Sequence, residues 1–324
     1  MASGWKTARA PATIANVGPG FDVFCLAIRG PADAVSLREA DEDSLGVEGP
    51  EADAVPSRFR ANTAGIVLSA MRLATGVRSG LEVIVRKGIP AGRGLGSSAA
   101  SCAAAALAFL KTFPGESERI GVAGFLRAAA EGEAAVSGRH YDNIAGALLG
   151  GFVSIASTEP LVLARETVSS RIHFAVAVPD FILTTAEMRK VLPRRVSLGD
   201  AVSNVGKAST LALALVRGDA MLAGRCLEDR FAEPPRSELL LGYRKVRAAA
   251  LDAGAEGFAI SGSGSTVFAL ASTKQAAEHS AKAMRDAFAS DGTTAKTFTT
   301  TVDNSLPLRA LVRDRGPRFS LVTP

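Results

Sequence analysis

The chain has 324 residues, of which 47% are hydrophobic and 21% charged, and its formal net charge is +5. That length and composition provide for about two domains with packed cores, and they exclude a disordered or fibrous chain. Three widely spaced cysteines without a CxxC pair exclude a disulfide framework and a thiolate zinc site.

Strand-like and helix-like segments alternate along the chain, which predicts a mixed α+β fold. In the first half, Ser97 and Ser98 occupy the positions of N-cap residues before an Ala-rich helix. Residues 41–60 are acidic and then proline-containing, and read as an excursion between elements. The remaining pattern predicts a strand over 81–85 and helices over 97–110 and 121–136.

The pattern changes after Gly150-Gly151, and a second α+β half follows. It predicts strands over 174–178, 257–260, 266–270 and 294–302, and helices over 187–192, 200–217, 237–253 and 275–289. We place the boundary near residue 160, which gives an N-terminal domain of residues 1–160 and a C-terminal domain of residues 161–324.

The first of three glycine-rich turns has the sequence PATIANVGPGFD, residues 11–22. A strand-like start leads into a tight Gly-Pro-Gly turn, and Asn16 and Asp22 are polar groups among apolar neighbours. A plain β-turn with an Asx hydrogen bond at Asp22 explains these residues as well as a binding site does.

The second turn, PAGRGLGSS at residues 90–98, places three glycines just before a helix. Glycines let backbone N–H groups approach a ligand closely, and a helix N-terminus adds unpaired donors and partial positive charge. Together these features favour an anion cradle, most naturally for phosphates. The loop is neither a Walker A loop nor a GxGxxG motif, and a purely structural turn before a capped helix is the alternative.

The third turn, SGSGST at residues 261–266, separates two short apolar strands and fits either a hairpin turn or a second surface around a phosphate. In this order the three turns resemble the motifs of the GHMP kinase superfamily. Further segments, among them SGRHYDNIAGALLGGF and SNVGKA, resemble the homoserine kinases of that superfamily. The resemblance extends from about residue 7 to about residue 271.

The resemblance implies an N-terminal half like ribosomal protein S5 domain 2, a ferredoxin-like C-terminal half, and an active site in the cleft between them. It also implies a kinase that transfers a phosphoryl group from ATP, with Mg²⁺, to the side-chain hydroxyl of L-homoserine in threonine biosynthesis. A GHMP kinase for a different small alcohol and a non-catalytic metabolite sensor are the alternatives.

For the nucleotide, the resemblance implies contacts to base and ribose from Asn62 and Lys87, whose alternatives are a helix-start Asn and an exposed strand-end Lys. Mg²⁺ is expected on Ser98 and Glu133. Glu131 is the alternative to Glu133, because residues two apart on a helix point about 200° apart and only one can face the pocket. The loop residues expected to bind nucleotide are Pro90, Ala91, Gly92, Arg93, Gly94, Leu95, Gly96, Ser97, Ser98, Ala99 and Ala100.

Homoserine is a zwitterion with a primary alcohol, so its carboxylate favours guanidinium groups and its ammonium favours an acid. By resemblance, Arg189 and Arg236 would bind the carboxylate, and Asp22 with Asn16 the ammonium. The residues expected to complete this pocket, with the reacting hydroxyl near the last two, are His140, Thr185, Gly264, Asp142 and Asn143.

The general base is left open, because Asn143 carries an amide that takes no proton at neutral pH. We expect Asn143 to orient the hydroxyl and proton loss to come late, with Asp142 as the alternative base. Ser265 and Gly146 stand where proline is common in the family, which puts loop stiffness in question. Asn204 and Lys207 share one helix face and either border the pocket or form a solvated polar face.

The expected partners are therefore L-homoserine and ATP, with a homodimer as is usual in the family. Basic stretches without interleaved aromatic residues argue against nucleic-acid binding. The longest uncharged run contains Gly and Ser and is short for a membrane span, so we expect no membrane partner. The N-terminus has no apolar leader, which predicts a cytoplasmic protein.

Overall fold

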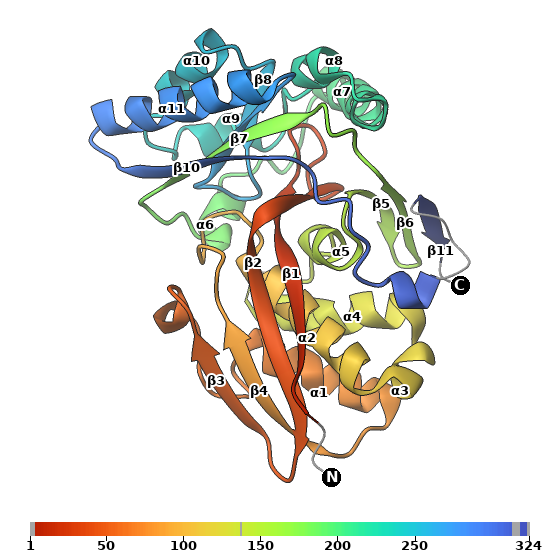
Figure 1. Cartoon of the computed structure of the whole chain (residues 1–324). Coiled ribbons are helices and arrows are strands. Elements are labelled where there is room, and N and C mark those ends of the chain that lie inside the picture. The colour runs from red at the N-terminus through yellow and green to blue at the C-terminus, as the bar shows by residue number, and fades with distance from the viewer. Residues whose placement is uncertain (1–3, 137, 313–317, 323–324) are drawn as a thin grey trace.

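The computed structural model describes residues 4–136, 138–312 and 318–322, and they form two sheets with their helices (Figure 1). The larger sheet has the strand order β11-β6-β5-β2-β4-β3, with β1 paired to β2, and the smaller has the order β10-β7-β9-β8. The predicted α+β class with two halves is confirmed. None of the helices in the described ranges combines the length and the apolarity needed to cross a bilayer.

The larger sheet and its helices come mainly from the first half of the chain. Its strands are β1 (Lys6–Ala15), β2 (Phe24–Ala40), β3 (Ser44–Glu48), β4 (Gly80–Arg86), β5 (Phe152–Thr158), β6 (Leu161–Glu166) and β11 (Phe319–Val322). Its helices are η1 (Ala52–Ala54), α1 (Thr63–Thr75), α2 (Ser97–Thr112), α3 (Pro114–Glu118), α4 (Gly121–Ala134), α5 (Asp142–Leu149) and η2 (Arg309–Val312).

Helix α2 is the centre of this half. Every residue from Ala99 to Leu110 is buried, because the helix packs on β1 and β2 and is covered by α1, α4 and α5. A helix enclosed on all sides carries no polar face, and its alanines let the neighbouring backbones approach closely. The loop that leads into α2 lies against the second half of the chain, since Ser261 Oγ donates to the Gly94 carbonyl at 2.6 Å. Figure 1 shows α2 packed beside β1 and β2.

The smaller sheet is antiparallel, and its edge strand β8 forms with β9 the hairpin that carries the third glycine-rich turn, with Ile260 opposite Val267. Its strands are β7 (His173–Pro179), β8 (Gly257–Ile260), β9 (Val267–Ala271) and β10 (Ala295–Thr300). Its helices are α6 (Thr185–Lys190), α7 (Leu198–Arg217), α8 (Ala220–Arg225), α9 (Glu233–Ser237), α10 (Tyr243–Asp252) and α11 (Lys274–Ser290).

After β10 the chain returns to the first half. Val302 bridges to Ile28, and β11 pairs with β6. The guanidinium of Arg165 is fully buried beneath this returning segment, where it donates to the carbonyls of Asn304 at 2.7 Å and Ser305 at 3.2 Å. The larger sheet is thus completed by residues near the C-terminal end of the chain.

Three predictions of local structure were wrong. The excursion over residues 41–60 contains β3, a short strand that runs parallel to β4. The helix predicted over 237–253 begins only at Tyr243, because Gly242 in a left-handed conformation interrupts it. The N-cap of α2 is Gly96, not a serine, since the hydroxyls of Ser97 and Ser98 are bonded elsewhere.

Candidate active site

The first glycine-rich turn bends the backbone sharply without relying on its glycines alone. Asn16, Val17 and Asp22 all have positive φ, which is unfavourable for residues with a Cβ. The Asn16 side chain supports the bend, since its Oδ1 accepts from the Asp22 N–H at 3.1 Å and its Nδ2 donates to the Gly262 carbonyl at 2.8 Å. The first and third turns are therefore tied together, and the Asp22 side chain is aimed into the space beside them.

The second turn lies against the other two, and two of its glycines are required there. A Cβ on Gly94 would lie 2.4 Å from the Ser261 carbonyl oxygen, and one on Gly96 would lie 2.0 Å from Thr13 Oγ1. Both residues have positive φ. A side chain at either position would separate the loop from the first or the third turn.

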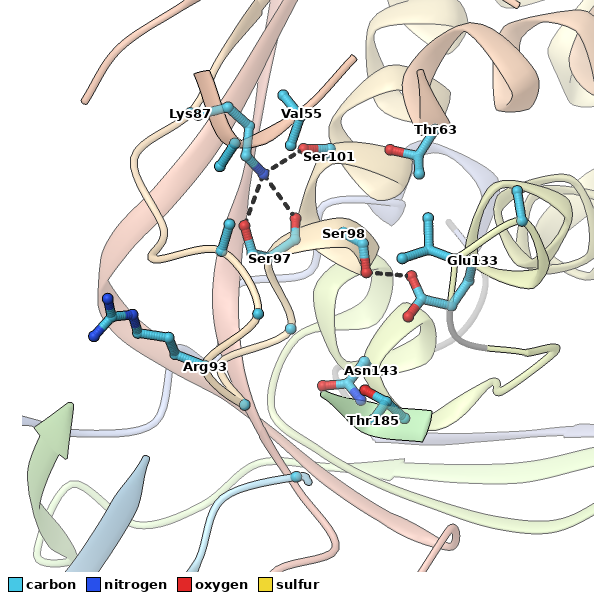
Figure 2. A pocket seen from close by; sticks show the side chains of 18 of the residues that line it. Val55, Thr63, Lys87, Arg93, Ser97, Ser98, Ser101, Glu133, Asn143 and Thr185 are labelled. Carbon is cyan, nitrogen blue, oxygen red and sulfur yellow. Dashed lines mark hydrogen bonds between the residues drawn. The ribbon is translucent and has the colours of Figure 1, made fainter. Parts of the chain in front are cut away.

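Lys87 lies beneath this loop rather than at its surface. It is buried, its ammonium group is paired with Asp33, and it also donates to Ser97 Oγ at 2.7 Å and Ser101 Oγ at 2.8 Å (Figure 2). These contacts account for the three hydrogens of the ammonium group. Lys87 therefore anchors the start of α2 from below. Its burial contradicts the exposed alternative, and it lies among the residues that line the cavity in front of the loop.

A cavity of about 520 Å³ opens in front of the loop and the start of α2 (Figure 2). Gly96 caps α2 without any side-chain hydrogen bond, so the first N–H groups of the helix are left for a ligand. Leu95, Ala99 and Ala100 pack into the core, and Pro90 does not line the cavity. The loop residues that line it are Ala91, Gly92, Arg93, Gly94, Gly96, Ser97 and Ser98.

Part of the lining of this cavity is apolar, and sequence reasoning did not foresee it. The apolar lining residues outside the loop include Ala54, Val55, Pro56, Val136 and Ile182. The only signal was the proline-containing segment before α1. Asn62 does line the cavity, but as the N-cap of α1: its Oδ1 accepts from the Ala64 N–H at 2.9 Å and its Nδ2 donates to the Pro56 carbonyl at 2.6 Å.

Of the two glutamates on α4, only Glu133 faces the loop. It is buried, and its Oε2 accepts from Ser98 Oγ at 2.7 Å (Figure 2). Glu131 turns to the surface and pairs with Arg139 at 2.8 Å. Ser98 and Glu133 thus present two hard oxygen ligands beside the phosphate-sized cradle, a donor set that suits Mg²⁺ with water and phosphate oxygens as its other ligands.

A second, smaller cavity of about 60 Å³ adjoins the first. Arg189 on α6 lies across it, donating to Asp22 Oδ1 at 2.8 Å and contacting His140 Nδ1 at 3.3 Å, so His140 accepts through Nδ1. Arg189 Nε is buried and has no hydrogen-bond partner among the described residues. A buried donor without an acceptor, beside a carboxylate, suits a ligand that carries both charges.

Arg236 on α9 lies on the other side of the small cavity. It is buried, with Nε donating to the Met188 carbonyl at 3.2 Å and Nη1 to the Gly262 carbonyl at 3.1 Å. Burial lowers its pKa, and the charge of Arg189 lowers it further. The positive charges of Arg189 and Arg236 repel each other. A bound anion such as a carboxylate would relieve that repulsion.

Asn143 and Thr185 line both cavities, together with Glu133, Gly262 and Ser263. Asp142 lies beside Asn143 in the small cavity and is buried. Burial raises the pKa of the Asp142 carboxyl to about 6, and the neighbouring Asp22 charge acts in the same direction. At neutral pH this carboxyl is therefore mostly ionised, which is the form that can accept a proton.

Four further residues that the sequence analysis named do not line either cavity in the structure. A Cβ on Gly264 would face Ile260, Met188 and Leu240, and its neighbours Gly262 and Ser263 line the cavity instead. Asn204 and Lys207 line neither cavity; they bind Asp229 and Glu228 and so hold the chain before α9. Ser265 Oγ donates to the Phe181 carbonyl at 2.6 Å.

Comparison with known proteins agrees with this geometry. Residues 62–151 match the GHMP kinase N-terminal domain and residues 211–290 the GHMP kinase C-terminal domain. The homoserine kinase of Thermococcus gammatolerans is 44% identical over 81% of this chain and 87% of its own length. That of Halorubrum lacusprofundi is 38% identical over 91% and 96%.

The fold of a solved homoserine kinase is also similar. The crystal structure of the enzyme from Cytophaga hutchinsonii superposes with a TM-score of 0.86 at 34% identity, covering 93% of this chain and 95% of the other. The two sheets, the glycine-rich phosphate cradle and both matched domains define a GHMP kinase. Within that class, the chain belongs to the homoserine kinase family.

Proposed function

We propose that this enzyme transfers the γ-phosphoryl group of ATP to the side-chain hydroxyl of L-homoserine and so produces O-phospho-L-homoserine for threonine biosynthesis. The observation that carries the proposal is the junction of the two cavities. Asn143, Thr185 and Glu133 line both of them, so a phosphate in the large cavity and a hydroxyl in the small one meet at the same side chains. Such positioning is the main requirement of phosphoryl transfer.

In this proposal the nucleotide occupies the large cavity. The N-terminus of α2, which has no side-chain cap, and the backbone of residues 91–98 bind the phosphates, and apolar lining residues such as Val55 and Val136 contact the base. Ser98 and Glu133 would hold Mg²⁺, which when bound neutralises charge on the phosphates. Lys87 acts indirectly, by fixing Ser97 and therefore the start of the helix.

The amino acid occupies the small cavity. Its carboxylate binds Arg189, whose Nε needs an acceptor, and Arg236. Its ammonium binds Asp22 and the Asn16 side chain, and its hydroxyl points toward Asn143 and Thr185. A neutral sugar or a dicarboxylate would leave one of these charges without its counterpart, which favours a small zwitterionic alcohol.

The substrate assignment is tested by measuring ADP release with Mg·ATP and L-homoserine, L-serine, mevalonate, galactose or no acceptor. We expect strong turnover with L-homoserine alone. Preferred turnover of mevalonate or galactose would contradict the assignment of homoserine as substrate, but it would agree with the assignment to the GHMP kinases. No turnover with any acceptor, despite measurable ATP binding, would favour a sensor. Homodimer formation in the cytoplasm is proposed from the family resemblance and is tested by light scattering of the pure protein.

We further propose that Asp142, the alternative base, accepts the hydroxyl proton, and this role predicts a pH dependence. Below about pH 6 its carboxyl is protonated and cannot accept the hydroxyl proton, so kcat/KM for homoserine falls as the pH decreases through that value. Asp142→Asn removes this acidic limb and lowers kcat about 10²-fold or more at neutral pH. Near-normal turnover of Asp142→Asn would assign proton loss to the phosphate or to solvent instead.

A further inference from the structure

Thr13, on β1, is a buried residue that none of the substrate arguments uses. Its backbone N–H donates to the Leu95 carbonyl at 3.1 Å, which joins β1 to the phosphate loop. Its side chain is fully buried, and Oγ1 lies 2.7 Å from Asn143 Oδ1. An amide oxygen only accepts, so the Thr13 hydroxyl is the donor.

This hydrogen bond determines which end of the Asn143 amide faces the reaction. With Oδ1 bound to Thr13, Nδ2 is the amide group left for other partners, and it donates to Asp142 Oδ1 at 3.4 Å, beside the residues that line both cavities. The reversed amide would place its oxygen against the oxygen of the Asp142 carboxylate. Thr13 and Asp142 therefore select the same orientation from opposite sides.

The Thr13 hydroxyl is itself supported from behind. The Cys25 thiol hydrogen-bonds with the Thr13 side chain, and burial raises the pKa of that thiol, so it keeps its proton. A Cβ on Gly146 would lie 2.4 Å from Cys25 Sγ and 3.2 Å from Thr13 Cγ2. Gly146, which departs from the family pattern and lies inside α5 rather than in a loop, leaves the space that this pair fills.

We propose that Thr13 is a positioning residue that holds the Asn143 amide with its N–H groups toward the acceptor hydroxyl. The inference rests on the proposed function. An amide that donates to the hydroxyl oxygen leaves the hydroxyl proton to point toward Asp142 or the phosphate, while the oxygen keeps a lone pair for attack on the γ-phosphorus. The reversed amide would accept that proton and direct it away from Asp142.

The test uses two substitutions: Thr13→Val keeps the shape of the side chain and removes the hydroxyl, and Thr13→Ser keeps the hydroxyl and removes one methyl group. Thr13→Val removes the donor and lowers kcat about tenfold, with KM for ATP unchanged, while Thr13→Ser retains activity to within about twofold. Unchanged kcat in Thr13→Val would overturn the proposal. So would an equal loss in both variants, because that result indicates packing rather than the hydroxyl.

A second measurement separates action through Asn143 from a general effect. In an Asn143→Ala background, Thr13→Val is expected to add no further loss in kcat, since the amide that it orients is gone. A full, multiplicative further loss would overturn the proposal. If the wild-type enzyme prefers another acceptor alcohol, the proposed substrate fails, and the same variants measured with that acceptor still decide the role of Thr13.

Discussion

Glu133→Gln is expected to lower kcat about 100- to 1000-fold, equivalent to about 3–4 kcal/mol of lost stabilisation of the transferring phosphoryl group. Gln keeps the shape and an oxygen that accepts from Ser98, but it removes the negative charge that would hold Mg²⁺. The measurement is ADP release at saturating ATP and homoserine over a range of Mg²⁺ concentrations. The variant should need more Mg²⁺ for half-maximal rate.

Glu131→Gln is the matched control for this experiment. It makes the same chemical change two residues earlier on α4, where the side chain is paired with Arg139 at the surface. We expect its kcat and Mg²⁺ requirement to equal those of the wild type. Equal effects of the two substitutions would contradict the assignment of Glu133 to the metal, and a thermal unfolding curve for each variant checks that the fold is intact.

Arg189→Met is expected to lower kcat/KM for homoserine about 100-fold while leaving KM for ATP unchanged, because truncating one partner of a partly buried charge pair costs about 2–5 kcal/mol. Met retains an apolar side chain over Phe21, whose ring lies 5.6 Å from the Arg189 guanidinium. The matched control is Lys190→Met, the next residue on α6, which is exposed and lines neither cavity.

A substrate without the carboxylate makes this test specific. The wild-type enzyme should discriminate strongly against 3-aminopropan-1-ol, which is homoserine without that group. In Arg189→Met this discrimination should be smaller, because the variant has already lost the interaction between Arg189 and the substrate carboxylate. Undiminished discrimination in the variant would place the carboxylate elsewhere, with Arg236 as the remaining guanidinium.

The parts of the fold and site that could be predicted are those with local signals. The glycine-rich loop directly precedes α2, and apolar and polar residues alternate within β4 itself, so each signal lies next to the element that it predicts. Contacts between distant residues could not be read in this way. Lys87 pairs with Asp33, 54 positions earlier, and Thr13 bonds Asn143, 130 positions later, and neither partner is signalled by its neighbours.

The choice between Glu131 and Glu133 illustrates the same limit. Helical periodicity shows that the two side chains diverge, but only the packing of α4 beside α2 determines which one meets Ser98. For the third turn the sequence left a hairpin and a phosphate-facing surface open. The structure shows the hairpin between β8 and β9, in which Gly264 faces apolar side chains and Gly262 lines the cavity. Such details depend on tertiary contacts.

The return of the chain after β10 has a consequence for biosynthesis. The first half of the chain leaves the ribosome well before residues 301–322 are synthesised. Arg165, however, donates to two carbonyl groups of that late segment, those of Asn304 and Ser305. Until then its guanidinium cannot be buried with those partners, and β6 lacks its neighbour β11. The phosphate-binding half is therefore expected to acquire its full stability only after residues 301–322 have been synthesised, although its central helix α2 ends at Thr112.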